Sequence, residues 1–578
     1  MVVASVERAQ PQNGAVVHEL PRHPVPERLA AILQDGVAAH QKGDTPAAAA
    51  AYQAALLLDP TCFDAHNNLA VALRSMGQPA EALAHLEAAV AAAPDRTEGY
   101  YNRGNALSDV GRLDEAVADY QAALAINPTA QGAWRNLAGV YGRLRRVADE
   151  LAAYRQLLTL DPANADWWNN LGAALYARGS IAASLACTRR AVALRPGFVV
   201  ALKNLGVTLA HAGDYAEASV VLGRAVAAGG LDAATLSALG QALVQTGDAT
   251  GAGQCFTRAL AADPRNLDAR LGLARSAFLS GDLEQAWQEY EWRWRLEGNP
   301  MPDGLGTPMW QGEDIAGKTL LVWAEQGIGD TLQFVRYLAL LRRRGARVVA
   351  MVQPPVASVV ATVAGADVVM PAGGGRPHFD LHAPLLSLPR LLGGGKEPLA
   401  ERVPYLSTPP GTSLPPIPAL DRPGLRVGVV WAGNPDHKND RNRSLPIETL
   451  LPVCAVPGTR FFSLQKGPAV AQLTSSGAET LIHDLSPLMH SYAETAALLD
   501  RLDLVISVDT SVVHLAGAMG KRVWCMLPFA PDWRWELWRS DTAWYPTMRL
   551  FRQLAPGNWG SVIAEVTRAL AQEARPMR

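Results

Sequence analysis

The sequence predicts a solenoid of helical repeats followed by an α/β module of two doubly wound lobes. Two observations predict this fold class. Proline and glycine recur every 34 residues through the first half, and after residue 310 short β-branched runs alternate with helices. The length of 578 residues also exceeds what one compact core accommodates, so several structural units are expected.

The first half carries the 34-residue period at several kinds of position. Prolines follow it at Pro60, Pro94, Pro128, Pro162 and Pro196, and glycines at Gly43, Gly77, Gly111, Gly179, Gly213, Gly247 and Gly281. Small residues that let two helices approach share the period with large residues that fill the gap beside them. We expect about eight helix–turn–helix repeats over residues 29–300, preceded by a disordered segment over residues 1–28.

These repeats resemble the tetratricopeptide family. The pattern is clearest in one repeat, at Trp168, Leu171, Gly172, Leu175, Gly179 and Pro196. The resemblance implies a right-handed solenoid with a long concave surface, of the kind that binds an extended peptide or another protein.

A ladder of asparagines has the same period. Asn68, Asn102, Asn136, Asn170 and Asn204 hold the sixth place of five consecutive repeats. In the tetratricopeptide family that place faces the groove, where a carboxamide can pair with a peptide backbone without reading its side chains. Resemblance to the O-linked N-acetylglucosamine transferases, which hold an acceptor protein on such a ladder, implies an acceptor-peptide site. The alternative is that these asparagines are repeat consensus, polar because they are exposed.

After residue 310 the sequence changes to α/β alternation. We expect a first lobe over residues 310–408, a proline-rich linker over 409–424 and a second lobe over 425–578. The expected strands cover residues 319–323, 347–351 and 367–370, and then 426–431, 460–464, 480–483, 504–508 and 522–527. Two such lobes place a ligand at the carboxyl ends of both sheets, in the cleft between them.

A first motif with residues suited to chemistry follows the strand at residues 504–508. Asp509, Thr510 and Ser511 stand at the start of a helix, whose N–H groups and dipole favour a phosphate, and His514 shares a face with Thr510. The segment resembles the nucleotide-sugar motif of the lipopolysaccharide heptosyltransferase family, with Ser511 in place of the usual glycine. The resemblance implies that these four residues bind the donor, and the replaced glycine leaves the identity of the sugar open. The alternative is an ordinary helix cap and a packed histidine.

A second match to the same family follows the first strand of the module. Gly329-Asp330-Thr331-Leu332 is similar to the Gly-Asp-x-Leu of those enzymes, which implies that Gly329 contacts the donor and that Asp330 is the catalytic base. An aspartate there can accept the proton of an attacking hydroxyl if it lies within hydrogen-bond reach. The alternative is that Asp330 only caps the helix expected over residues 331–344.

A basic loop supplies the third match. Lys438, Arg441 and Arg443 follow the strand at 426–431 and are suited to neutralise a leaving nucleotide, unless the loop is merely solvated. Gln465, at the end of the next strand, is a weaker nucleotide candidate. The sequence has no D-x-D pair to hold a cation, so we expect no metal and no cofactor beyond the nucleotide-sugar substrate. The tryptophan-rich segment at 531–545 is either a stacking surface or a packed lid.

The amino-acid composition argues against several classes of protein. The net charge is −2, so no overall field favours nucleic acid or an anionic membrane as partner. Five scattered cysteines without C-x-x-C spacing indicate neither a zinc cage nor a disulfide framework. We expect a cytoplasmic protein, because no signal peptide and no apolar stretch long enough for a membrane span is visible.

Together the motifs resemble a compact, metal-independent GT-B glycosyltransferase whose family implies inversion of the anomeric carbon. The first lobe is shorter than in that family, so the repeats are inferred to recognise a protein acceptor. The organisation is similar to that of bacterial flagellin glycosyltransferases. Two rivals remain: a non-catalytic tetratricopeptide scaffold with a degenerate transferase module, and a heptosyltransferase-like enzyme that acts on a glycan.

Overall fold

The computed structural model describes residues 25–296, 305–375, 377–393, 403–437 and 439–574. The chain forms two compact units, Met1–Asn204 and Leu205–Arg578. This division falls within the repeats, inside helix α11 (Val199–Ala212), and not near residue 300 where the sequence pattern changes. Helix α1 (Val25–Gln41) begins four residues before the predicted start of the repeats, and the rest of the segment predicted to be disordered lies outside the described residues.

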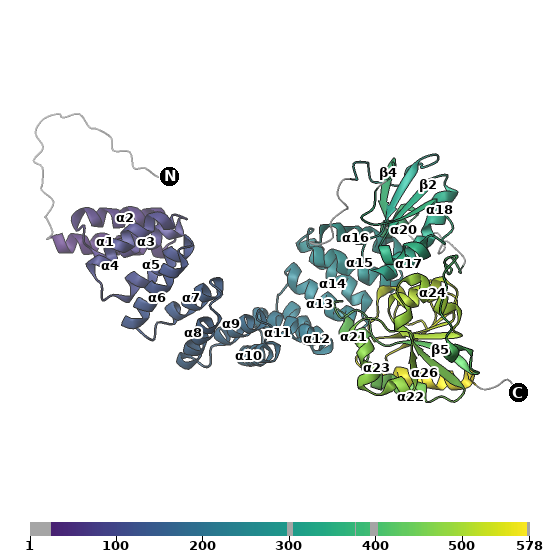
Figure 1. The fold of residues 1–578 in the computed structure, drawn as a ribbon. Coiled ribbons are helices and arrows are strands. Elements are labelled where there is room, and N and C mark those ends of the chain that lie inside the picture. Colours follow the sequence, from purple (N-terminus) through teal and green to yellow (C-terminus); the bar gives the residue numbers. More distant parts are fainter. Residues whose placement is uncertain (1–24, 297–304, 376, 394–402, 438, 575–578) are drawn as a thin grey trace, which may run out of the picture. The chain divides into compact units, whose positions relative to one another are not determined.

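The N-terminal unit consists of helices that pack in consecutive antiparallel pairs, as the repeat pattern predicts (Figure 1). After α1 they are α2 (Thr45–Leu58), α3 (Phe63–Ser75), α4 (Pro79–Ala92), α5 (Thr97–Asp109), α6 (Leu113–Ile126), α7 (Gln131–Arg143), α8 (Val147–Leu160), α9 (Ala165–Tyr176) and α10 (Ile181–Leu194).

The periodic glycines have a conformational reason. Gly77 and Gly111 end their helices with φ of +80° and +82°, the left-handed conformation that glycine adopts without strain. Arg145 takes the place of glycine in one repeat and still has φ of +57°. Within the pairs, a Cβ added at Gly104 would lie 2.8 Å from the ring of Tyr120, so this glycine allows the two helices to approach.

The C-terminal unit begins with the remaining repeats. They comprise α12 (Tyr215–Ala227), α13 (Ala233–Gln245), α14 (Ala249–Ala262), α15 (Leu267–Ser280), α16 (Leu283–Tyr290) and the 3₁₀ turn η1 (Glu291–Arg295). These helices are not a separate body, because one cluster of buried side chains runs from Leu236 on α13 through the first lobe to Leu550 in the second.

The first lobe is a four-stranded parallel sheet in the order β3-β2-β1-β4 (Figure 1). Its strands are β1 (Thr319–Trp323), β2 (Arg347–Val352), β3 (Val368–Pro371) and β4 (Leu381–Pro384), and its helices are α17 (Ile328–Phe334), α18 (Leu338–Arg343), α19 (Ala357–Val360) and α20 (Leu388–Leu391). The predicted helix over 331–344 is instead α17 and α18 joined by the 3₁₀ turn η2 (Val335–Tyr337). Strand β4 was not predicted, because it is short and contains both histidine and proline.

The second lobe is a six-stranded parallel sheet in the order β10-β9-β8-β5-β6-β7. Its strands are β5 (Leu425–Val430), β6 (Thr459–Ser463), β7 (Ile482–Asp484), β8 (Leu504–Val508), β9 (Val523–Leu527) and β10 (Met548–Arg552), and its helices are α21 (Asp440–Arg443), α22 (Ile447–Cys454), α23 (Ala471–Ser475), α24 (Tyr492–Asp500), α25 (Ser511–Ala518) and α26 (Trp559–Glu573). The predicted linker has irregular backbone apart from the turn η5 (Pro418–Asp421) and buries Ile417 and Leu420. No helix among the described residues is both long enough and apolar enough to span a bilayer.

Candidate active site

The two motifs predicted to carry chemistry meet where α17 of the first lobe packs on α25 of the second. The approach is closest at Gly329, where an added Cβ would lie 2.8 Å from Cδ2 of His514. Both helices start just after a central strand of their sheet, α17 after β1 and α25 after β8. The carboxyl ends of these strands therefore face the same place, as expected for parallel α/β lobes.

Asp330 lies in the first turn of α17, and its side chain is 17% exposed. Its Oδ2 accepts the backbone N–H of Gly327 at 3.0 Å, which is the capping role considered above. Its Oδ1 pairs with Arg534. Burial raises the pKa of Asp330, and the charge of Arg534 opposes that rise. Both carboxylate oxygens of Asp330 thus have protein partners, and a role as base stays a prediction.

Arg534 is the centre of the charge network and was not singled out from the sequence. It lies in the 3₁₀ turn η9 (Trp533–Trp535), with a side chain that is 9% exposed. Besides pairing with Asp330, it donates from Nη1 to Oδ1 of Asp532 at 2.8 Å and from Nε to Oε1 of Gln333 at 2.5 Å. One guanidinium thus joins carboxylates from both lobes.

Asp509 and His514 form the second-lobe side of the site. Burial and the charge of Asp532 raise the pKa of Asp509 to about 6. Nε2 of His514 lies 3.8 Å from Oδ1 of Asp509, and Nδ1 lies 3.0 Å from the hydroxyl of Tyr545. Burial and the charge of Arg534 lower the pKa of His514 to about 3, so the ring is neutral at pH 7.

Thr510 and Ser511 begin α25. Thr510 is the N-cap residue, but its side chain makes no capping bond, and its Oγ1 lies 3.2 Å from Oγ of Ser507. Oγ of Ser511 lies 2.6 Å from the hydroxyl of Tyr492. The first N–H groups of α25 are therefore not capped by the side chain before them, and such groups favour an anion.

Of the predicted basic residues in the loop after β5 that the structure describes, only Arg443 is found near the site. Arg443 pairs with Asp440 at 3.2 Å. Its positive charge acts to lower the pKa values of both Asp509 and His437, so its guanidinium lies near the second-lobe side of the site. Arg441 instead donates to the backbone oxygen of His211 at 3.1 Å and to the hydroxyl of Tyr215 at 3.4 Å. Lys438 lies outside the described residues.

The side-chain amide of Gln465 forms hydrogen bonds with backbone groups. Its Oε1 accepts the N–H groups of Trp431 and Ala432 at 3.1 and 3.0 Å, and its Nε2 donates to the carbonyls of Ala432 and Lys466 at 2.9 and 2.8 Å. The side chain joins the ends of β5 and β6. A contact between Gln465 and a nucleotide stays a prediction.

The last repeats contact the site directly, which the sequence pattern did not indicate. Phe278 of α15 stacks on Trp533 with ring centroids 4.0 Å apart and an interplanar angle of 21°. Arg275, one turn earlier on α15, faces Asp532, whose charge opposes the fall in pKa that burial of Arg275 causes. The hydroxyl of Tyr290 donates to Oε1 of Gln326, in the loop before α17, at 3.0 Å.

The predicted asparagine ladder lies in the N-terminal unit, and its members are all half-buried. Their side chains join neighbouring repeats. The bonds run from Nδ2 of Asn102 to Oδ1 of Asn67 (2.8 Å), from Nδ2 of Asn136 to Oδ1 of Asn105 (2.6 Å) and from Nδ2 of Asn204 to Oδ1 of Asn169 (2.8 Å), while Asn68 and Asn170 accept from Asn67 and Asn169 (3.2 Å each). A role in holding a peptide stays a prediction.

Comparison with known proteins agrees with both halves of this description. Tetratricopeptide repeat models match residues 34–97, 97–130, 143–197 and 243–291. The model of glycosyltransferase family 9 (heptosyltransferase) matches residues 461–527, which include the end of β6, all of β7, β8 and β9, and the α25 motif. The chain therefore joins tetratricopeptide repeats to a C-terminal region of the family 9 glycosyltransferase type.

A curated relative and several solved structures are similar to parts of the chain. Protein FlbA of Caulobacter vibrioides is 26% identical over 329 residues, which are 52% of this chain and 55% of that protein, so the match spans about half of each. Among solved structures, MamA is 23% identical and covers 28% of this chain and 94% of its own, with a TM-score of 0.27. A tetratricopeptide repeat protein from Parabacteroides merdae is 17% identical and covers 43% of this chain and 98% of its own, with a TM-score of 0.36.

Proposed function

We propose that the chain transfers a sugar from a nucleotide-sugar to a hydroxyl group of a protein held by its repeats. The observation that carries the proposal is the meeting of Asp330 from the first lobe with Asp509, His514 and Arg534 from the second. Buried carboxylates with raised pKa values at the carboxyl ends of two parallel sheets are what a transfer site of this kind requires.

Asp330 is the proposed general base. As the acceptor oxygen attacks the anomeric carbon, Asp330 takes the hydroxyl proton, the bond from that carbon to the phosphate breaks, and the nucleotide leaves with the electron pair. Attack from the face opposite the nucleotide inverts the anomeric carbon. A carboxylate with a raised pKa is the stronger base, while Arg534 keeps it ionised, so the pair suits proton transfer near neutral pH.

The leaving nucleotide needs positive charge and hydrogen-bond donors. Arg443 and the N-terminal N–H groups of α25 supply them from the second lobe, with Thr510 and Ser511 at the same helix end. Neutral His514 is positioned by Tyr545 and can hydrogen-bond without adding charge. The reaction written this way uses no cofactor and no metal.

The repeats are the proposed acceptor site. Their concave surface suits an extended polypeptide. Two features favour a protein over a lipid-linked glycan: the length of the solenoid and the direct packing of α15 and α16 against the catalytic loops. A flagellin-type acceptor is the specific form of this proposal.

The test compares intact masses of the proteins that co-purify from the native host with three forms of the full chain: the wild type, Asp330→Asn and Asp541→Asn. Asp541 is the matched control, because its side chain is 71% exposed and, within the described part of the chain, forms an ion pair with Arg539 alone. A partner should carry an added sugar mass with the wild type and Asp541→Asn. With Asp330→Asn the rate of transfer should fall by about 10²–10⁴-fold.

Three results would each support a different conclusion. If a partner binds the wild type but never carries a sugar, the scaffold alternative replaces transfer. If Asp330→Asn transfers as fast as the control, the module is a transferase whose base is another group. A lipid-linked saccharide modified in place of any protein would assign the glycan alternative.

A further inference from the structure

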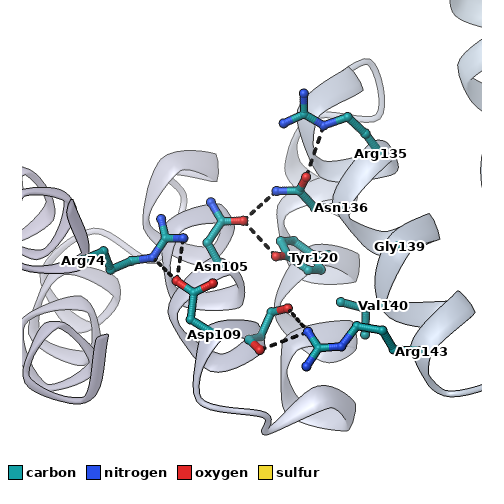
Figure 2. Close-up of a pocket in the computed structure, with 10 residues that line it drawn as sticks. Arg74, Asn105, Asp109, Tyr120, Arg135, Asn136, Gly139, Val140 and Arg143 are labelled. Carbon is teal, nitrogen blue, oxygen red and sulfur yellow. Dashed lines mark hydrogen bonds and ion pairs between the residues drawn. The ribbon is translucent and has the colours of Figure 1, made fainter. Parts of the chain in front are cut away.

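A hollow with a cationic lining lies among the repeats of the N-terminal unit. It has a volume of about 320 Å³ and is lined by side chains of α3, α5, α6 and α7, as Figure 2 shows. That volume is at the lower end of the range of about 300–1,000 Å³ in which ligand pockets fall. Asn136, one rung of the asparagine ladder, is part of the lining.

The hollow carries excess positive charge. Its lining contains three guanidinium groups, those of Arg74, Arg135 and Arg143, and one carboxylate, that of Asp109, which gives a net charge of +2. Asp109 is already paired: its Oδ2 lies 2.8 Å from Nε and 2.7 Å from Nη2 of Arg74. The two remaining arginines thus have no carboxylate partner within the part of the chain that the structure describes.

Both arginines are exposed, and most of their donors have no protein partner among the described residues. Arg135 donates only from Nε, to Oδ1 of Asn136 at 3.2 Å, and Arg143 donates only from Nη1, to the carbonyl and hydroxyl oxygens of Ser108 at 3.1 and 2.9 Å (Figure 2). The terminal nitrogens of Arg135 and the Nε and Nη2 of Arg143 are without protein partners among the described residues. An unpaired guanidinium edge binds a carboxylate through two parallel hydrogen bonds.

The amide of Asn105 adds a neutral donor to the same hollow. Its Oδ1 accepts the hydroxyl of Tyr120 at 2.8 Å and Nδ2 of Asn136 at 2.6 Å. These two bonds fix the orientation of the amide, and its nitrogen has no acceptor in the described chain. A neutral donor beside charged ones matches a polypeptide, which offers backbone carbonyls beside its carboxylates.

We propose that this hollow binds a segment of the acceptor polypeptide rich in Asp and Glu. The inference rests on the proposed function and narrows it, since it specifies by charge which polypeptides the solenoid accepts. A polypeptide is favoured over nucleic acid because the chain as a whole has a net charge of −2, whereas binding of a phosphate backbone rests on neutralising several phosphates with Lys and Arg.

The test measures binding without any transfer step. A fluorescein-labelled peptide in which glutamate alternates with serine is titrated with the full chain, and the matched peptide has glutamine in place of each glutamate. The acidic peptide should bind at least about tenfold more tightly, and this difference should shrink between about 50 mM and about 200 mM salt. The double variant Arg135→Gln and Arg143→Gln should abolish the difference.

The control is Arg155→Gln. Arg155 is an exposed arginine on the neighbouring helix α8, with no side-chain partner within the described chain, and its replacement should leave both affinities unchanged. Circular dichroism and the melting temperature establish that each variant is folded. Equal affinity of the wild type for the two peptides overturns the proposal even if sugar transfer to a protein is observed. Competition by a single-stranded oligonucleotide or by inorganic phosphate as strong as that by the acidic peptide would assign a general anion site instead.

Discussion

The joint between the last repeat and the first lobe is a buried ion pair, and its removal has a predictable cost. Arg293 of η1 is 1% exposed and donates from Nε and Nη2 to the two oxygens of Glu325, each at 2.9 Å. It also donates to Ser387 at 2.8 Å and to Glu291 at 2.8 Å. Glu325, with a side chain that is 2% exposed, lies two residues after β1.

Replacement of Arg293 by methionine keeps the apolar stem and leaves the carboxylate of Glu325 buried, with the N–H of Leu386 at 3.1 Å as its remaining partner. An uncompensated buried charge costs about 3–5 kcal/mol. That is a large share of the roughly 5–15 kcal/mol that stabilises a typical fold. The double variant Arg293→Met and Glu325→Gln removes the stranded charge and should recover part of the loss.

Urea unfolding followed by tryptophan fluorescence measures these changes. All fifteen tryptophans except Trp134, Trp167 and Trp168 lie in the C-terminal unit, so the signal reports mainly on that unit. The control is Arg342→Met, whose side chain is 59% exposed and lies 3.6 Å from Asp367, and whose loss should cost less than about 1 kcal/mol. The reasoning would be refuted if Arg293→Met lost no more stability than Arg342→Met. It would also be refuted if the double variant were less stable than Arg293→Met alone.

Two further predictions concern the site itself. His514 has a pKa of about 3 in the fold against 6.5 in an unfolded chain, so its contribution to stability is complete above pH 6.5 and falls as the pH drops, by roughly 2 kcal/mol at pH 5. Between pH 7.5 and pH 5, urea titrations should show the wild type losing about 2 kcal/mol more than His514→Gln, because Asp509 and the other groups that titrate in this range are present in both; equal changes would contradict it. Gly329→Ala places a Cβ 2.8 Å from Cδ2 of His514 and should push α17 away from α25. The rate of sugar transfer should fall by about 10²-fold, and the overpacking should cost about 1–3 kcal/mol of stability, which leaves the variant folded. Gly223→Ala, with open space at its Cβ, is the matched control, and an unchanged rate for Gly329→Ala would show that the two helices need not be so close.

Local signals in the sequence predicted the framework of the α/β module well. Strands β1 and β8 have the predicted bounds, because each is a continuous run of apolar residues between turns. The repeats were predicted from their period, and the positive φ of Arg145 shows that the turn geometry persists where glycine is replaced. Strand β10 was missed, since its two arginines hide the apolar residues among them.

The network of charged side chains around Arg534 could not be predicted from local sequence signals. Arg534 and Asp330 are paired across 204 positions of sequence, and no spacing rule connects them. The tryptophan segment was left between two interpretations, and the structure shows packing: Trp533, Trp535 and Trp544 are buried, whereas Trp538 is 65% exposed. The contact of Phe278 with Trp533 was also invisible, because a repeat pattern specifies how repeats pack on one another and not what the last repeat meets.

The packing assigns the repeats to two different compact units. Helices α13 to α16 share a hydrophobic core with the α/β module, and Val226 of α12 packs against it. Helix α15 contacts the turn that carries Arg534, and α16 contacts the loop that precedes α17 and Asp330. The asparagine ladder and the cationic hollow both belong to the other unit. On the two proposals above, changes of charge in the hollow should alter which polypeptide is bound without disturbing Asp330 and Arg534. A replacement such as Arg293→Met acts on the core that positions those residues. The proposed acceptor selectivity and the proposed catalytic site thus depend on different units of the chain.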